Sequence, residues 1–195
     1  MTQAAFILLA YLLGSISFGI LVSRAFGLPD PRTVGSGNPG ATNVLRSGKK
    51  LPAILTLLGD AAKGWLAVFL VQHYGLQDAT ICLAGLAAFI GHLYPVFSSF
   101  KGGKGVATAL GVLLAFSAWL GLSVVIVWVI AFSIWRYSSL AALIAAVIAP
   151  IAAWFLLPYK GYAVTALVLA LLLVWRHKSN IEKLLKGAEA GFGKK

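Results

Sequence analysis

Long apolar segments separated by short polar connections make up most of this chain of 195 residues. A bilayer core offers no water to exposed backbone groups, so only helices and closed barrels cross it. Hydrophobic residues form 60% of the chain and charged residues only 11%, whereas soluble domains carry about 25% charged residues. The sequence therefore predicts an all-α polytopic membrane protein, with residues 1–195 forming one domain.

The number of spans depends on one segment, residues 106–135, which is apolar for 30 residues. A span needs about 20 residues, so this segment is either one strongly tilted helix or two helices with a tight turn near 117–121. In the second case the first helix is short. The other predicted spans are residues 4–23, 52–72, 80–97, 139–156 and 162–175.

Basic residues favour the second alternative and set the orientation. With seven helices and the N-terminus outside, fourteen of the sixteen Lys and Arg residues fall in cytoplasmic segments, as the positive-inside rule requires. No basic residue precedes the first apolar run, which argues against a signal peptide. The net charge of +11 then reflects topology and contact with membrane lipid, and we expect no nucleic-acid partner.

A polar stretch from Gly35 to Arg46 interrupts this apolar chain. Asn38-Pro39 is typical of a helix start, with Asn as the N-cap and Pro in the first helical position. Glycines before a helix N-terminus expose backbone N–H groups that bind anions. The stretch is interpreted as a phosphate cradle; the alternative is a flexible connector. Its donors and glycines are Ser36, Gly37, Asn38, Gly40, Thr42, Asn43 and Arg46.

Residues 100–108 repeat this pattern before the predicted short helix. The segment lacks the Walker A spacing. Taken alone, it is equally compatible with a basic loop that touches anionic headgroups. Two such loops on one face favour phosphate as the ligand. The residues concerned are Lys101, Gly102, Gly103, Lys104, Gly105 and Thr108.

The basic tail, residues 176–195, is predicted to form a helix lying on the membrane surface. Ser179 and Glu182 have the spacing of a capping box. The tail could serve only as an anchor, but His177 and Asn180 stand at its junction with the last span, where they could face both loops. Histidine is suited to proton transfer near neutral pH.

Three ionisable residues lie inside predicted spans, where such groups are costly and tend to pair. Asp60 and Lys63 share one helical face, and pairing or lining the site are equally compatible with the sequence. His92 is more typical of a structural histidine. The His73-x-x-x-x-Asp78 pattern matches an acyltransferase signature, but it falls in a connection on the opposite face and is interpreted as a turn.

With these stretches in view, the sequence resembles the acyl-phosphate-dependent glycerol-3-phosphate acyltransferases of bacteria, the PlsY family. The resemblance rests on residues 35–46, 91–108 and 176–189, together with Asp60 and Lys63-Gly64. It implies a seven-span inner-membrane enzyme whose site faces the cytoplasm. Such an enzyme transfers a fatty acyl group from acyl phosphate to the 1-hydroxyl of glycerol 3-phosphate, giving lysophosphatidic acid and phosphate in the first acylation step of phospholipid synthesis. Acyl-CoA and acyl carrier protein are not donors.

The residues and the resemblance together predict direct transfer without an acyl-enzyme, since acyl phosphate is already activated. Arg46 and Lys104 would hold phosphates, while Ser36, His177 and Asn180 would orient the glycerol. The proton would pass to the departing phosphate or to His177. Asp60, Lys63 and His92 would support the site, and no metal or cofactor is expected. The enzyme that makes acyl phosphate is a candidate partner.

Three alternatives stay open at this stage. Ser36 could act as a nucleophile, although no base neighbours it in the sequence. The chain could be a small transporter for a phosphorylated metabolite, but transporters usually consist of repeated halves, and no repeat occurs here. A structural scaffold for lipid enzymes would leave both glycine-rich loops unexplained.

Overall fold

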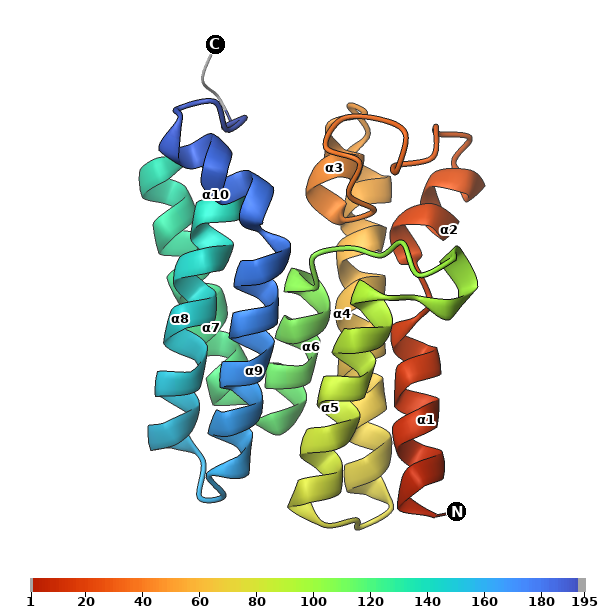
Figure 1. The fold of residues 1–195 in the computed structure, drawn as a ribbon, viewed down its shortest axis with the longest axis vertical. Helices are drawn as coiled ribbons and strands as arrows, with labels where there is room; N and C mark the ends of the chain where they lie inside the picture. Colours follow the sequence, from red (N-terminus) through yellow and green to blue (C-terminus); the bar gives the residue numbers. More distant parts are fainter. Residues whose placement is uncertain (1, 193–195) are drawn as a thin grey trace.

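The computed structural model describes residues 2–192, and all regular secondary structure among them is helical (Figure 1). The last three residues of the predicted tail, 193–195, lie outside this range. The elements are α1 (Gln3–Gly14), α2 (Phe18–Ala25), α3 (Ala41–Leu45), α4 (Lys50–His73), α5 (Asp78–Leu93), the 3-10 turn η1 (Val96–Ser98), α6 (Val106–Phe116), α7 (Ala118–Trp135), α8 (Ser138–Leu156), α9 (Gly161–Arg176) and α10 (Lys178–Leu185).

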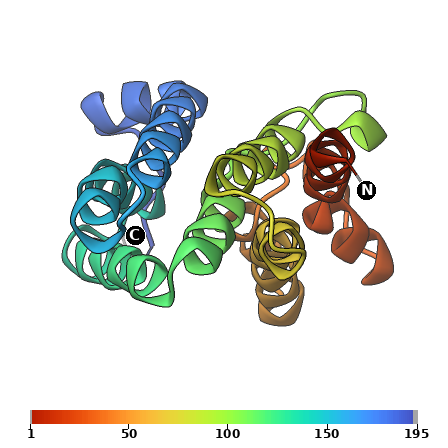
Figure 2. The same cartoon turned by 90° about the horizontal axis from the view of Figure 1, so that it is seen from below.

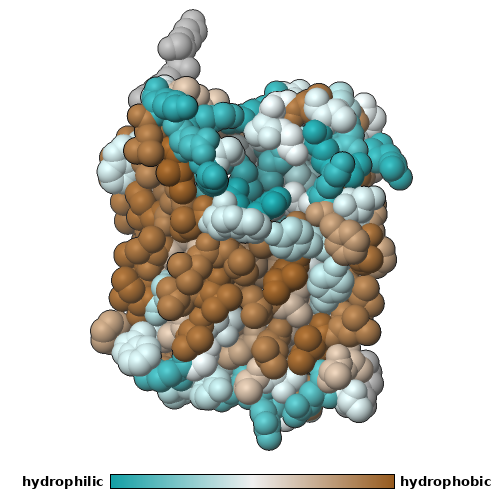
Figure 3. Space-filling view, in the orientation of Figure 1, coloured by the Kyte–Doolittle hydropathy of each residue, from teal (hydrophilic) through white to brown (hydrophobic). Residues whose placement is uncertain are grey.

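Four segments of the described chain are long and apolar enough to cross a membrane singly: α4, α7, α8, and α5 extended through η1. Two bent pairs, α1 with α2 and α9 with α10, bring the number of candidate spans to six. These segments match the predicted spans, and Figure 3 shows a brown apolar band between teal polar ends. The chain is an integral membrane protein.

The long apolar run contains two helices, as the charge distribution favoured. Ser117 has extended backbone, with φ −163° and ψ 133°, and separates α6 from α7. Just beyond this break Gly121 packs against Leu114 so closely that a Cβ would collide with the leucine side chain. The first helix of the pair, α6, has only 11 residues.

The first predicted span is broken, because α1 and α2 meet at an angle of 41° around residues 15–17. The break frees the Ile16 carbonyl from helical bonding, and the Lys63 ammonium group of α4 donates a hydrogen bond of 2.6 Å to it. A buried charge thus satisfies a backbone acceptor that the bend leaves unpaired.

The helices form two groups joined by α6 (Figure 2). One group contains α1, α4 and α5, and the other contains α7, α8 and α9. Glycines let α6 approach α4, because a Cβ at Gly64 would meet the Thr108 carbonyl and one at Gly111 would meet the Ala61 carbonyl. This junction places the N-terminus of α6 between the groups.

Two predicted helix starts are wrong. The helix after the opening loop begins at Ala41 with Gly40 as its N-cap. Asn38 accepts a hydrogen bond of 2.9 Å from the Gly40 N–H across Pro39, so this proline makes a tight turn before the helix. In the tail, α10 begins directly after His177, whose carbonyl accepts from Asn180 and Ile181 N–H groups. Ser179 therefore lies inside the first turn and forms no capping box.

Candidate active site

The opening loop between α2 and α3 is folded around the buried side chain of Asn43. Its amide group donates to the carbonyls of Pro31 (2.8 Å) and Val34 (3.1 Å), while its Oδ1 accepts from the Ser36 N–H (2.9 Å). Gly35 has φ +59°, and a Cβ there would collide with Asn43 Oδ1. Asn43 thus holds the loop in shape, and the Ser36 hydroxyl group is left at its surface.

The second loop runs below α3 and α10 in Figure 1 and leads into α6. Gly103 donates its N–H to the His92 carbonyl at 3.1 Å. Gly105 is the N-cap of α6 with φ +86°, which a glycine adopts freely. The first backbone N–H groups of α6 have no acceptor within the helix, so they form an anion-binding end.

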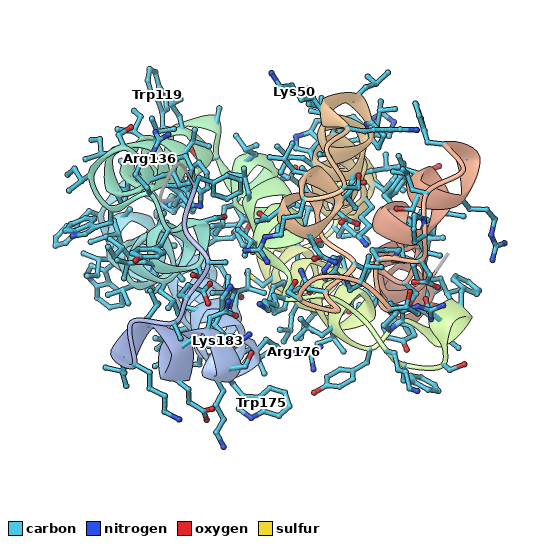
Figure 4. The ribbon with its side chains drawn as sticks, turned by 90° about the horizontal axis from the view of Figure 1, so that it is seen from above. Lys50, Trp119, Arg136, Trp175, Arg176 and Lys183 are labelled. Carbon is cyan, nitrogen blue, oxygen red and sulfur yellow. The ribbon has the colours of Figure 1, made fainter. Side chains whose placement is uncertain are left out.

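Arg176 fixes this loop from the opposite side. Its guanidinium donates to the carbonyls of Gly102 and Gly103, each at 3.2 Å. In Figure 4, Arg176 lies between the C-terminal helices and the loop, whereas its neighbour Trp175 points outward. By engaging two carbonyls, Arg176 holds the loop in the conformation that leads into the N-terminus of α6.

A chain of polar contacts crosses the site from the second loop to α8. The Lys104 ammonium group donates to Asn180 Oδ1. The amide nitrogen of Asn180 donates to Glu189 Oε1 at 2.7 Å, and Ser139 donates to the same oxygen at 2.6 Å. Burial lowers the pKa of Lys104, and the Glu189 carboxylate partly offsets this effect. A phosphate beside Lys104 would stabilise its charged form in the same way.

His177 lies at the bend of 60° between α9 and α10 and is buried. Its Nδ1 lies 2.8 Å from the Leu173 carbonyl. A carbonyl only accepts, so Nδ1 carries the hydrogen, and the Nε2 of the neutral ring is left as an acceptor. The sequence placed His177 at this junction, and the structure agrees.

Two further contacts link the opening loop to the C-terminal half. The hydroxyl groups of Thr42 and Ser138 lie 3.2 Å apart, and Arg46 donates to the Ala190 carbonyl at 3.4 Å. These residues surround the mouth of a cavity of about 380 Å³. The cavity continues between α6, α7, α8 and α9, where its walls are almost entirely apolar.

An ion pair lies buried beside this cavity. Lys63 Nζ and Asp60 Oδ1 are 2.8 Å apart, and His92 Nδ1 is 3.6 Å from the same oxygen. Asp60 and His92 also line the cavity, whereas Lys63 does not. Both sequence alternatives for Asp60 and Lys63 therefore hold in part: the two residues pair, and one of them reaches the site. His92 also supports the second loop through its carbonyl group.

The structure brings most of the predicted site residues to this one cavity. Gly37, Lys101, Gly102, Gly103 and Thr108 do not line it. Thr108 is instead fully buried at the contact between α6 and α4, where its hydroxyl oxygen has no hydrogen-bond partner among residues 2–192. The predicted residues that line the cavity are Ser36, Asn38, Gly40, Thr42, Asn43, Arg46, Asp60, His92, Lys104, Gly105, His177 and Asn180.

Sequence reasoning did not select Ser138, Ser139 or Glu189 as site residues, although all three line the cavity. Ser138 and Ser139 come shortly after α7 and belong to no sequence motif. Glu189 belongs to the tail stretch that carried the family resemblance, and this was the signal available for it. The His73…Asp78 pattern occupies the turn between α4 and α5, where Asp78 accepts from the Tyr162 hydroxyl at 2.6 Å.

The arrangement offers two chemically different environments in contact. Lys104, Arg46 and the N-terminus of α6 suit phosphate oxygens. The apolar part of the cavity between α6, α7, α8 and α9, called the shaft below, suits an aliphatic chain. Between these regions, Asn180 and His177 provide polar groups of fixed orientation. Among residues 2–192 no three His, Cys, Asp or Glu side chains gather as metal ligands would.

Comparison with known proteins gives a consistent result. The family model described as glycerol-3-phosphate acyltransferase matches residues 4–187. Two proteins of that name are similar: one from Methylobacillus flagellatus, 68% identical over the whole of both chains, and one from Nitrosospira multiformis, 57% identical over all of this chain and 98% of the other.

Two crystal structures of PlsY, an integral membrane glycerol 3-phosphate acyltransferase, are similar as well. The glycerol 3-phosphate form has a TM-score of 0.92 and 41% identity, covering 98% of this chain and 96% of the other. The lysophosphatidic acid form has a TM-score of 0.91 and 39% identity, covering 98% and 95%.

Proposed function

Because the chain belongs to the glycerol-3-phosphate acyltransferase family, we propose that it transfers an acyl group from acyl phosphate to the 1-hydroxyl of glycerol 3-phosphate. The products are lysophosphatidic acid and phosphate. One observation carries this proposal: a polar mouth with Lys104, Arg46 and Asn180 opens directly into an apolar cavity of about 380 Å³. The glycerol 3-phosphate and lysophosphatidic acid forms of PlsY support the same acceptor and product.

The reaction is a direct transfer. The acceptor hydroxyl oxygen attacks the carbonyl carbon of the donor, the carbonyl–phosphate bond breaks, and phosphate leaves with the electron pair. Lys104 and Arg46 hold the phosphates, and Lys104 stabilises the charge on the leaving group. Asn180, His177 and Ser36 orient the glycerol. The hydroxyl proton passes to the departing phosphate, or to the free Nε2 of His177.

The supporting residues keep these groups in place. Asn43 shapes the opening loop, and Arg176 with His92 shapes the second loop. Glu189 orients the Asn180 amide, so that its oxygen faces Lys104 and its nitrogen faces the carboxylate. Asp60 and Lys63 neutralise one another beside the site. Gly37, Gly40, Gly102, Gly103 and Gly105 allow the turns, and Lys101 adds positive charge near the entrance.

The proposal includes a topology. The chain spans the bacterial inner membrane seven times, with α6 as the short span, the N-terminus outside and the site facing the cytoplasm. The distribution of Lys and Arg supports this orientation. Residues 1–195 form one domain, and α10 lies at the membrane surface, where the 84% exposed Leu185 contacts lipid. The enzyme that makes acyl phosphate is the expected partner.

The test uses the purified full-length protein in lipid vesicles. With palmitoyl phosphate and glycerol 3-phosphate we expect equal amounts of lysophosphatidic acid and phosphate, and none with acyl-CoA or acyl carrier protein as donor. Uptake of glycerol 3-phosphate without product would support the transporter alternative instead. A radiolabelled acyl group that stays on the denatured protein in stoichiometric amount would refute direct transfer.

Lys104→Ala tests the phosphate role, with Lys178→Ala on the exposed face of α10 as the matched control. We expect loss of activity in the first variant only. Wild-type activity in Lys104→Ala would exclude the assigned role.

A further inference from the structure

The cavity has a definite depth below its polar mouth. Along α8 it extends from Ser138 to Ala149, and along α9 it extends from His177 back to Ala166. Each stretch contains twelve residues, so eleven rises of 1.5 Å separate its ends and make it about 16 Å long. Two antiparallel helices thus give the same depth independently.

A pair of aromatic rings lies below the deepest residues of the cavity. Phe116, at the end of α6, and Tyr162, at the start of α9, have ring centroids 4.8 Å apart, and both are buried. The Tyr162 hydroxyl donates to Asp78 at 2.6 Å, which fixes its ring. Leu113 and Ala166, one turn above Phe116 and Tyr162, line the cavity, whereas the two rings do not. Each ring thus lies one turn beyond the last cavity-lining residue of its helix, and this position is the basis for treating the pair as the floor of the cavity in the proposal below.

Small side chains keep the shaft open above this floor. Ala142, Ala145, Ala146 and Ala149 of α8 line the cavity, and on α9 it is lined by Ala166 and Ala170. Larger side chains at these positions would fill the space between the helices. Ala149 and Ala166 are the lining residues of α8 and α9 that lie farthest from the mouth, so larger side chains there would shorten the shaft.

We propose that Ala149 and Ala166, above the Phe116–Tyr162 floor, set the longest acyl chain that the enzyme accepts. This inference rests on the proposed function, in which the acyl chain of the donor lies in the shaft and its carbonyl carbon lies at the mouth. The ligand of the deep end is the methyl terminus of a saturated fatty acyl chain. A chain longer than the shaft has to bend or leave its carbonyl carbon short of Lys104.

The experiment measures kcat/KM for a series of donors from octanoyl to octadecanoyl phosphate, with Ala149→Leu and Ala166→Leu. Each leucine adds three carbon atoms at the deep end. At about fourfold per displaced methylene, we expect a loss on the order of 50-fold for donors that fill the shaft. Octanoyl phosphate, which stops short of the floor, should keep its kcat/KM within about twofold.

Ala152→Leu is the matched control, because Ala152 lies on α8 but does not line the cavity. Leu113→Ala probes the opposite direction, since it enlarges the deep end and should raise kcat/KM for the longest donors relative to the wild type. If one leucine variant does not fold, the other leucine variant and Leu113→Ala still test the inference.

Two outcomes are distinguishable. If the wild type turns over no acyl phosphate, the proposed function itself fails. If the wild type is active and each variant changes kcat/KM by the same factor for every donor length, the proposed role of the floor is overturned while the function stands.

Discussion

Replacing Glu189 by alanine is expected to weaken catalysis without changing the fold. One carboxylate oxygen, Oε1, accepts from Asn180 at 2.7 Å and from Ser139 at 2.6 Å. A hydrogen bond to a charged group contributes about 1.5–3 kcal/mol. Loss of the bond to Asn180 leaves its amide free to turn away from Lys104, and 1.4 kcal/mol is about tenfold. We therefore expect kcat/KM to fall by about 10- to 100-fold.

A second effect acts in the same direction. The Glu189 carboxylate opposes the effect of burial on the pKa of Lys104. Without it, this pKa falls further, and a smaller fraction of Lys104 is charged when substrate binds.

The assay is lysophosphatidic acid formation by purified protein in vesicles, with acyl phosphate saturating and glycerol 3-phosphate varied. Glu189→Gln keeps an oxygen acceptor for Asn180 but loses the charge, so it should recover part of the activity. Glu182→Ala, on the exposed side of α10, is the control. If Glu189→Ala matches this control within about twofold, Glu189 does not position Asn180 and the reasoning is refuted.

Three further predictions concern other contacts. Lys63→Met leaves the Asp60 carboxylate without its lysine partner and the Ile16 carbonyl without a donor, so it should cost about 3–5 kcal/mol of stability. Adding Asp60→Leu should restore only part of this loss, because the Ile16 carbonyl stays unpaired. Unfolding in detergent measures both variants, and an unchanged Lys63→Met midpoint would contradict this. Arg176→Lys replaces the guanidinium, which donates to two loop carbonyls at once, by a single ammonium group. KM for glycerol 3-phosphate should therefore rise about tenfold at similar kcat, with Lys178→Arg as control. Burial lowers the pKa of Lys104, so its charge is present at lower pH and is lost as pH rises through that depressed value. We therefore expect kcat/KM to decline on the alkaline side at a lower pH than the titration of an ordinary lysine would give. A decline that persists in Lys104→Arg would exclude Lys104 as its cause.

The helices were predictable because apolar runs and their lengths determine what crosses a membrane. Even the break near Ser117 followed from length and charge, since one helix of 30 residues would have moved the basic tail to the other side. The predicted starts at Asn38-Pro39 and Ser179 failed for a local reason. Pro39 serves a tight turn equally well, and the bend at His177 lets α10 begin at Lys178, directly before Ser179.

The contacts within the candidate site were beyond sequence reasoning, because they join residues far apart in the chain. Lys104 meets Asn180 across 76 positions, and Ser139 meets Glu189 across 50. A motif indicates that Lys104 or Asn180 has a role, but no spacing indicates that one bonds the other. These pairs form because α10 and the segment after it pack against α8, α9 and the loop before α6.

The short length of α6 affects how deep in the membrane the second loop lies, and so how the proposed substrates would reach it. Its 11 residues measure about 16 Å, roughly half the hydrocarbon thickness of about 30 Å. The loop before it therefore lies recessed, beneath α3 and α10 (Figure 1). Lifting a chain of about 16 carbons from a leaflet into water costs on the order of 12 kcal/mol, at about 0.8 kcal/mol per methylene. In the proposed reaction, this depth would place Lys104 at the level of the lipid, so that the water-soluble acceptor would reach a donor whose acyl chain stays in the leaflet.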